Sequence, residues 1–402
     1  MIIEIHGAGF QNKGAELMLN AAAYELRQRL SSLDLAIDPL YGSYNSRCGL
    51  TLHQIMPFRS HVGTPGFHKY FLRQKFFSYM RGEKLLSMMG MPTNLYGGVK
   101  LSDIKGFVDI SGFAYTDEWG VRPVQDLAAL TSYYKSNNVP VILLPQAFGP
   151  FRLGETRTAF KKVLANASLV FARDHQSYDY ALELSSGGGK LSIAPDITLF
   201  YPNTSPVNIK AVAIPKYACV VPNIRVLDKG KIPWGEKYYS FLHNVIKELL
   251  RCGLHVLIIV HDSTGEDLKI SSRLCKENSS TDVTLVQEED PIALKRIIAQ
   301  SFLVAGSRYH SLVAALSQCV PALAIGWSHK YDMLFHEFGL KKFVFSSPET
   351  PVSEVLQRVS ELAEPNVNTS HRGQIYSHLQ ELSLVNREMW SLVEDTLAGH
   401  SA

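Results

Sequence analysis

Short apolar runs alternate with longer amphipathic stretches along most of this chain. The strand-like runs of the first half are Ile2–Ile5, Val108–Ile110, Val141–Leu144 and Leu169–Phe171. Those of the second half are Ala218–Val221, His255–Val260, Val283–Val286, Phe302–Ala305 and Ala322–Ile325. Runs that are apolar at nearly every position are typical of strands buried on both faces, as in parallel sheets covered by helices. The pattern therefore predicts an α/β fold with doubly wound parallel sheets.

The length of 402 residues favours two domains of ordinary size. Prolines and small polar residues in Tyr201–Lys216 break both periodicities, which suggests a linker. We predict an N-terminal α/β domain over residues 1–205, a C-terminal α/β domain over 206–370, and a helix over 371–402 that packs back on the first domain. Two such Rossmann-like domains would face a central cleft, a common place for a ligand.

Composition excludes several classes of function. The net charge of +3 is mild and no nucleic-acid-binding motif occurs, so we expect no nucleic acid partner. The five cysteines include no CxxC pair, and the histidines form no HExxH, so we predict no metal site. With no signal peptide pattern and no apolar run near the roughly 20 residues that span a bilayer, we expect a cytoplasmic protein.

Residues 57–90 depart from the α/β rhythm because basic and aromatic side chains alternate there with a single acid, Glu83. A segment of this kind can lie on an anionic membrane surface or accept a lipid-linked substrate. An ordinary packed helix with solvated Lys and Arg side chains is the alternative. Because of this segment, a position of the protein at the inner face of the membrane, as a peripheral protein, stays open.

The segment Gly306–His310 carries the clearest chemistry. It places Arg308 and His310 two residues apart, where the apolar run Phe302–Ala305 gives way to an apolar helix. Helix N-termini at strand ends attract anions, Arg suits carboxylate and phosphate, and His moves protons near neutral pH. The pattern predicts a small anionic substrate and a proton transfer beside it. Because neighbouring Arg side chains favour neutral imidazole, His310 needs a carboxylate or the substrate phosphate to stay protonated.

Several motifs, in this order, resemble the polysaccharide pyruvyl transferase family, from about Ile3 to Leu340. They are the Gly-rich turn Gly7–Leu19, Asp109–Gly112, Pro145–Pro150, Ala172–Asp174, Ala194–Asp196 and Ser307–His310. Two positions depart from the family pattern. Many members carry Asn-x-Gly-Asp at the N-terminal turn, whereas this chain has Ala15 at the Asp position and an acid, Glu16, one position later. Between Arg308 and His310, this chain has Tyr309 where an apolar residue is frequent. These departures concern the acceptor more than the donor.

The resemblance implies a GT-B-like fold and a pyruvyltransferase of surface polysaccharide biosynthesis, such as that of an exopolysaccharide or a capsule. Such an enzyme moves the pyruvyl group of phosphoenolpyruvate onto two sugar hydroxyls and forms a cyclic ketal. Phosphoenolpyruvate is then the donor substrate and no cofactor is expected. The partner is a glycan acceptor, which the segment 57–90 suggests is lipid-linked.

Roles follow from the resemblance and the chemistry together. His310 is the expected general acid, with Asp109 and Glu16 as bases for the acceptor hydroxyls. Asp196 is expected to have a structural role in a turn, and the pair His261–Asp262 is left unassigned. The residues expected to bind phosphoenolpyruvate are Arg308, Arg173, Tyr309, His329 and Lys330. Those expected to bind the acceptor sugar are Asn12, Ser111 and Gln146.

Other functions remain open at this stage. A GT-B glycosyltransferase with a nucleotide-sugar donor would share the architecture, and Glu337 could bind its ribose. A nicotinamide enzyme is disfavoured because Gly7 and Gly9 are not followed by a third glycine at position 12. A non-catalytic carbohydrate-binding protein would tolerate replacement of Arg308 and His310.

Overall fold

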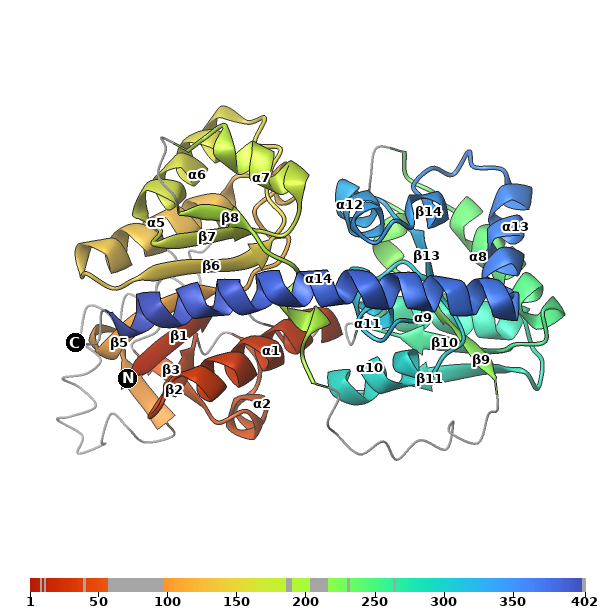
Figure 1. Cartoon of the computed structure of the whole chain (residues 1–402), viewed down its shortest axis with the longest axis horizontal. Helices are drawn as coiled ribbons and strands as arrows, with labels where there is room; N and C mark the ends of the chain where they lie inside the picture. The colour runs from red at the N-terminus through yellow and green to blue at the C-terminus, as the bar shows by residue number, and fades with distance from the viewer. Residues whose placement is uncertain are drawn as a thin grey trace, which may run out of the picture. The chain divides into compact units, whose positions relative to one another are not determined.

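The computed structural model describes residues 1–7, 9–10, 12–38, 41–56, 97–185, 190–202, 216–229, 232–262 and 265–399. These form two compact units (Figure 1). Unit 1 consists of Met1–Phe10, Met18–Pro195 and Asn386–Ala402, and unit 2 of Gln11–Leu17 and Asp196–Val385. The division falls after Pro195 rather than after residue 205. The basic aromatic segment 57–90 lies outside the described residues.

Unit 1 is built on a parallel sheet in which eight strands are described, in the order β4-β3-β2-β1-β5-β6-β7-β8. The strands are β1 (Ile2–His6), β2 (Asp34–Ile37), β3 (Leu52–Met56), β4 (Gly98–Lys100), β5 (Ile104–Asp109), β6 (Val141–Gln146), β7 (Leu169–Ala172) and β8 (Leu191–Ile193). The helices along this part of the chain are α1 (Lys13–Arg29), α2 (Tyr44–Gly49), α5 (Arg122–Ser136), α6 (Gly154–Asn166) and α7 (His175–Leu182). The first turn of α1 belongs to unit 2.

Unit 2 holds a second parallel sheet, with six described strands in the order β11-β10-β9-β12-β13-β14. The strands are β9 (Tyr217–Val221), β10 (His255–Val260), β11 (Val283–Gln287), β12 (Val304–Gly306), β13 (Ala322–Ile325) and β14 (Val344–Phe345). The helices are α8 (Lys237–Arg251), α9 (Glu266–Glu277), α10 (Pro291–Ala299), α11 (Tyr309–Leu316), α12 (His329–Glu337) and α13 (Val352–Ala363). The prediction of two α/β domains with parallel sheets is confirmed.

The cores follow from the apolar runs. Every residue of Val141–Leu144 is fully buried, and so is every residue of Ala218–Val221, because helices cover both faces of each sheet. Strand β1 is an exception within this pattern. Its Glu4 is fully buried although the neighbouring positions are isoleucines.

The chain ends in helix α14 (Pro365–Ala398), which Figure 1 draws as one uninterrupted helix. Its residues from Asn386 onward belong to unit 1, where Trp390 and Leu397 are buried. Gly106 of β5 leaves room for this helix, since a Cβ there would lie 2.6 Å from Leu397 Cδ2. Within the described part of the chain, we find no helix with the length and apolar character needed to span a bilayer.

Candidate functional site

The predicted site residues fall into two polar clusters, one in each unit. The unit 2 cluster lies where β10 and β12 end and where α1 and α11 begin. The unit 1 cluster lies where β1, β5 and β6 end. Carboxyl ends of parallel strands are the usual ligand-binding edge of such sheets, so both clusters occupy positions suited to function.

The turn before α11 is held by a buried hydrogen-bond network around Ser307. The carbonyl of Ser307 accepts hydrogen bonds from Asn223 Nδ2 at 3.0 Å and from Tyr331 Oη at 2.8 Å. Its hydroxyl accepts one from Tyr238 Oη at 2.6 Å. Satisfied buried networks are rigid, so this one fixes the direction in which the next residues, Arg308 to His310, leave the strand.

Arg308 makes a two-pronged contact with Asp267 at the start of α9. Its Nε and Nη2 donate to the two carboxylate oxygens at 2.7 Å each, and Nη2 also lies 3.3 Å from Asp262 Oδ2. Burial alone would lower the pKa of Arg308, but the hydrogen bonds and charge of Asp267, with that of Asp262, raise it. Among the described residues, the hydrogen bonds and ion pairs of the guanidinium are made by Nε and Nη2.

His310 faces a carboxylate. Its Nε2 lies 3.8 Å from Oδ2 of Asp196, which precedes the short helix η4 (Ile197–Leu199). The other oxygen, Oδ1, accepts hydrogen bonds from Thr198 N at 3.0 Å and Thr198 Oγ1 at 2.7 Å. Asp196 thus has the structural role expected from the sequence and also provides the carboxylate that a protonated His310 requires.

The N-terminus of α1 packs against His310. Asn12 pairs with Asp262 in an isolated antiparallel bridge, and its Oδ1 caps the helix by accepting from Gly14 N at 2.9 Å. A Cβ on Gly14 would lie 2.1 Å from His310 Nδ1, so only glycine permits this approach. Asn12 and Glu16, which the sequence assigned to the N-terminal domain, therefore lie in unit 2 with His310.

Three further ionisable side chains belong to the unit 2 cluster. Lys13 Nζ lies 3.1 Å from Glu16 Oε2, and burial raises the pKa of Glu16 while Lys13 opposes the shift. His261 is buried, and its pKa lies well below the ordinary value because of desolvation and the nearby charges of Arg308 and His310. Burial therefore favours the neutral form of His261.

The other residues predicted to bind phosphoenolpyruvate are distributed over both units. Tyr309 is buried in α11 beside Lys330, whose Nζ lies 5.6 Å from the Tyr309 ring and 4.7 Å from that of Trp327. His329 and Lys330 begin α12, directly after the β13 strand and its turn. Arg173 is buried at the end of β7 in unit 1, where its backbone N donates to Gln146 O at 2.9 Å. Arg308 and Arg173 thus come from different units.

Lys295 supports the cluster from α10. The side chain is buried, and its Nζ donates to the carbonyls of Thr198 at 2.8 Å and Tyr201 at 3.0 Å. These bonds hold the segment that follows Asp196. Burial lowers the pKa of Lys295 to about 8, while the charge of Asp196 opposes the shift.

This shift predicts a pH dependence of stability. Between pH 8 and the ordinary pKa of 10.5, the unfolded chain binds a proton at Lys295 that the folded chain does not. Stability therefore rises with pH across this window, by about 3 kcal/mol at 1.36 kcal/mol per pKa unit. Urea unfolding at several pH values should show this rise in the wild type and lose it in Lys295→Met. Parallel profiles for the two proteins would contradict the expectation.

In unit 1, Asp109 is the centre of the cluster. Its Oδ1 accepts from Ser111 N at 3.1 Å and Gln146 Nε2 at 2.7 Å, and its Oδ2 from Tyr115 Oη at 2.7 Å and Ser111 Oγ at 3.1 Å. Asp109 is fully buried. The predicted base therefore accepts hydrogen bonds from two predicted sugar ligands, Ser111 and Gln146, while Gln146 Oε1 is buried with no hydrogen-bond partner among the described residues.

Two more side chains complete this cluster and were not singled out from the sequence. They are Glu4 and His6, which follow each other on the same face of β1. His6 is paired in register with Asp109 of β5. A carboxylate and an imidazole two residues apart in an otherwise apolar strand are the signal that could have identified them.

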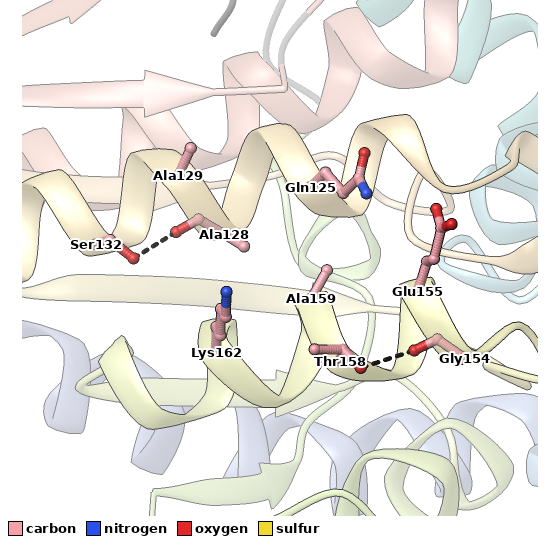
Figure 2. Close-up of a pocket in the computed structure, with 9 residues that line it drawn as sticks. All are labelled: Gln125, Ala128, Ala129, Ser132, Gly154, Glu155, Thr158, Ala159 and Lys162. Atoms are coloured by element: carbon pink, nitrogen blue, oxygen red, sulfur yellow. Dashed lines mark hydrogen bonds between the residues drawn. The ribbon is translucent and has the colours of Figure 1, made fainter. Parts of the chain in front are cut away.

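A groove of about 660 Å³ lies in unit 1, between α5 and α6 (Figure 2). The hydroxyls of Ser132 and Thr158 donate to carbonyls of their own helices, at Ala128 and Gly154. The residues that line it are Gln125, Ala128, Ala129, Ser132, Gly154, Glu155, Thr158, Ala159 and Lys162. No predicted site residue is among them.

Comparison with known proteins gives two results. A model of the polysaccharide pyruvyl transferase family matches residues 12–329. No protein of curated function has a significantly matching sequence.

Solved structures resemble the chain over nearly its whole length. A UDP-GlcNAc 2-epimerase from Methanocaldococcus jannaschii, in complex with UDP-GlcNAc and UDP, has a TM-score of 0.54 at 11% identity and covers 90% of this chain and 93% of its own. UGT2 from Phytolacca americana, complexed with UDP-2-fluoro-glucose and pterostilbene, has a TM-score of 0.52 at 11% identity, covering 97% and 99%. HepE from Anabaena, in complex with UDP and glucose, has a TM-score of 0.53 at 13% identity, covering 98% of both chains. These similarities show the fold alone, and the predicted GT-B-like architecture is confirmed.

Proposed function

Because this chain belongs to the polysaccharide pyruvyl transferase family, we propose that it transfers the pyruvyl group of phosphoenolpyruvate onto two hydroxyls of a glycan, forming a cyclic ketal. The observation that carries the proposal is the placement of His310. Its imidazole lies between the Asp196 carboxylate and the Gly14 backbone, two residues along the chain from Arg308. A proton donor beside an anion-binding group is what activation of phosphoenolpyruvate requires.

In the proposed reaction, the protonated His310 gives its proton to the methylene carbon of phosphoenolpyruvate. The adjacent carbon, C2, then carries oxocarbenium character and is attacked by one hydroxyl of the glycan. The C2–O bond to phosphate breaks, and the second hydroxyl attacks C2 and closes the ketal. Two hydroxyl protons are lost in total, which balances one proton gained by the methylene carbon and one gained by the departing phosphate.

Donor binding would use the groups that the unit 2 cluster presents. Asp267 and Asp262 offset the charge of Arg308, so its Nη1 edge would contribute directed hydrogen bonds more than net charge. Lys13 and Lys330 are further cations of this unit, and the N-terminus of α11 adds a partial positive charge. Together these groups suit the carboxylate and phosphate of phosphoenolpyruvate.

The finer parts of the proposal concern the acceptor and its location. A surface glycan is proposed as the acceptor because the family acts on polysaccharides. Its attachment to a lipid, and a peripheral position at the cytoplasmic face of a membrane, depend on residues 57–90. The lipid attachment and the membrane position stay predictions. The membrane position can be tested by measuring whether the full chain binds to anionic lipid vesicles.

The test is an assay of the purified protein with phosphoenolpyruvate and a panel of glycans. Release of phosphate only when a glycan is present, together with formation of an acid-labile ketal on that glycan, would support the proposal. Release of UDP from a UDP-sugar, with no use of phosphoenolpyruvate, would contradict it and favour the glycosyltransferase alternative.

The variant Asp196→Asn tests in this assay whether His310 acts as the acid. Without the carboxylate, His310 is less readily protonated, and we expect kcat to fall about 10-fold or more. Asp282→Asn is the matched control, because Asp282 also faces a histidine of unit 2, with its Oδ1 3.9 Å from His255 Nδ1, but is largely exposed. This control should keep full activity. Equal kcat in both variants would argue against His310 as the acid.

A further inference from the structure

Asp267 lies in the first turn of α9 and is fully buried. Acidic side chains are favourable at helix N-termini, but an exposed one provides this effect without being desolvated. The neighbouring Glu266 is such a residue, with 46% of its side chain exposed. The burial of Asp267 therefore indicates a role beyond its own helix, and its hydrogen bonds show with which side chain.

Both carboxylate oxygens of Asp267 accept hydrogen bonds. Arg308 donates from Nε to Oδ2 and from Nη2 to Oδ1, at 2.7 Å each. The backbone N of Ile224, which begins the short helix η6 (Ile224–Val226), donates to Oδ1 at 3.1 Å. A guanidinium bound through two nitrogens to one carboxylate is fixed in its plane as well as in its position.

The segment that holds Asp267 also holds the backbone next to Arg308. Asn223 Nδ2 donates to the carbonyl of Ser307 at 3.0 Å, and Asn223 directly precedes Ile224 in the chain. One short segment thus fixes the carbonyl before Arg308 and, through Asp267, its guanidinium. Both ends of this side chain are anchored, and all of these residues belong to unit 2.

We propose that Asp267 is a positioning residue for the donor: it holds the Arg308 guanidinium in the orientation in which it meets phosphoenolpyruvate. This assignment rests on the proposed pyruvyl transfer. An arginine side chain has many rotamers, and ordering it on binding weakens affinity. A guanidinium that is ordered before the donor arrives avoids this loss. Arg308 contacts the donor, and Asp267 acts through Arg308.

The charge of Asp267 has the opposite effect on the donor. A carboxylate next to the binding group repels an anionic ligand, so removing the charge alone would tighten the binding of phosphoenolpyruvate. Losing the orientation of Arg308 weakens the binding instead. The direction of the change in affinity therefore separates a positioning role from an electrostatic one. A purely structural role predicts no change in affinity in a folded variant.

The experiment measures phosphoenolpyruvate binding by titration calorimetry, and steady-state kinetics, for the wild type and Asp267→Asn. Asparagine has the size of aspartate, but its amide nitrogen cannot accept a hydrogen bond from Arg308. We expect Kd and KM for phosphoenolpyruvate to rise about 10-fold, with kcat at saturating donor within about three-fold of the wild type. Glu266→Gln is the matched control, because it removes the same charge one residue earlier, and it should keep Kd within about two-fold.

A double-variant cycle tests whether the effect passes through Arg308. A lysine at position 308 keeps the positive charge but has no planar fork for two bonds to one carboxylate. In the Arg308→Lys background, Asp267→Asn should therefore weaken phosphoenolpyruvate binding no further. A second weakening of about 10-fold in that background would show that Asp267 acts independently of Arg308, and would overturn the assignment.

The remaining outcomes separate the two proposals. If the wild type binds phosphoenolpyruvate and Asp267→Asn binds it equally or more tightly, the positioning role is overturned and the pyruvyltransferase function stands. A wild type that neither binds phosphoenolpyruvate nor forms a ketal overturns the function, and the assignment falls with it.

A second variant decides if thermal melting shows that Asp267→Asn is unfolded. Asp267→Glu keeps the charge beside Arg308 but moves both oxygens by one methylene group. Binding that is weaker by about 10-fold would support the positioning role, because the charge is unchanged. Wild-type affinity in the folded Asp267→Glu protein would overturn it.

Discussion

His310→Gln is expected to lower kcat by about 10²–10⁴-fold while phosphoenolpyruvate still binds within a few-fold of the wild type. Glutamine keeps a polar side chain of similar reach but cannot deliver a proton at neutral pH. The loss should therefore appear in turnover and not in donor affinity, which Arg308 and the lysines of unit 2 are proposed to supply. Steady-state kinetics and titration calorimetry on the same preparation would measure the two effects separately.

Gly14→Ala tests the same group without removing it. A Cβ at this position would lie 2.1 Å from His310 Nδ1, so the imidazole must move away from its place beside Asp196. We expect turnover to fall by about 100-fold or more, since misplacing a reacting group by about 1 Å can cost that much. Gly154→Ala is a suitable control, because the space around a Cβ there is empty. Full activity in Gly14→Ala would show that the position of the His310 ring is not critical.

Arg308→Ala is expected to lower the free energy of unfolding by about 3–5 kcal/mol, because it removes one partner of a buried ion pair. Asp267 is fully buried and both its oxygens accept from Arg308. Without the guanidinium, an uncompensated carboxylate stays in the interior. Urea unfolding followed by circular dichroism would measure the loss.

The neighbouring pair provides the control for this measurement. Arg225 and Glu266 lie 3.1 Å apart, but both side chains are more than 40% exposed. Arg225→Ala should therefore cost only about 0–1 kcal/mol. Similar losses in the two variants would show that the Arg308 pair is not the buried support that the geometry indicates. Because of this expected instability, donor binding is better tested with Arg308→Lys, which keeps a positive charge, than with Arg308→Ala.

The sequence predicted the central strands of both sheets because these strands are apolar throughout, and burial on both faces demands that. It missed β2, β3, β4, β8 and β14, which are short or mix polar with apolar residues and so carry little periodicity. Their places in the sheet come from pairing with distant strands. Local pattern therefore identified strands that are apolar at nearly every position, including the edge strand β11, and missed short or mixed strands both at the edges and inside the unit 1 sheet.

For the candidate site, local sequence pointed to Arg308 and His310 because a strand end, a helix start and the two side chains are adjacent in the chain. It could not pair His310 with Asp196, or Arg308 with Asp267, since those contacts join distant segments. Asp109 shows the opposite limit. Its position at the end of a buried strand was predicted, but its hydrogen-bond donors are three other side chains and a backbone amide, and only the folded chain reveals them.

The division of the chain into units also bears on how the protein folds during synthesis. Unit 1 contains Met1–Phe10, which leave the ribosome before the residues of unit 2, yet it also includes Asn386–Ala402, which follow all of unit 2 in the chain. Domains usually fold in the order in which they emerge. Here the surface of unit 1 that Trp390 and Leu397 pack against stays exposed until the ribosome has translated unit 2. The unit that is begun first is thus expected to be completed last, and a nascent chain that stalls before residue 386 should expose apolar surface that chaperones bind.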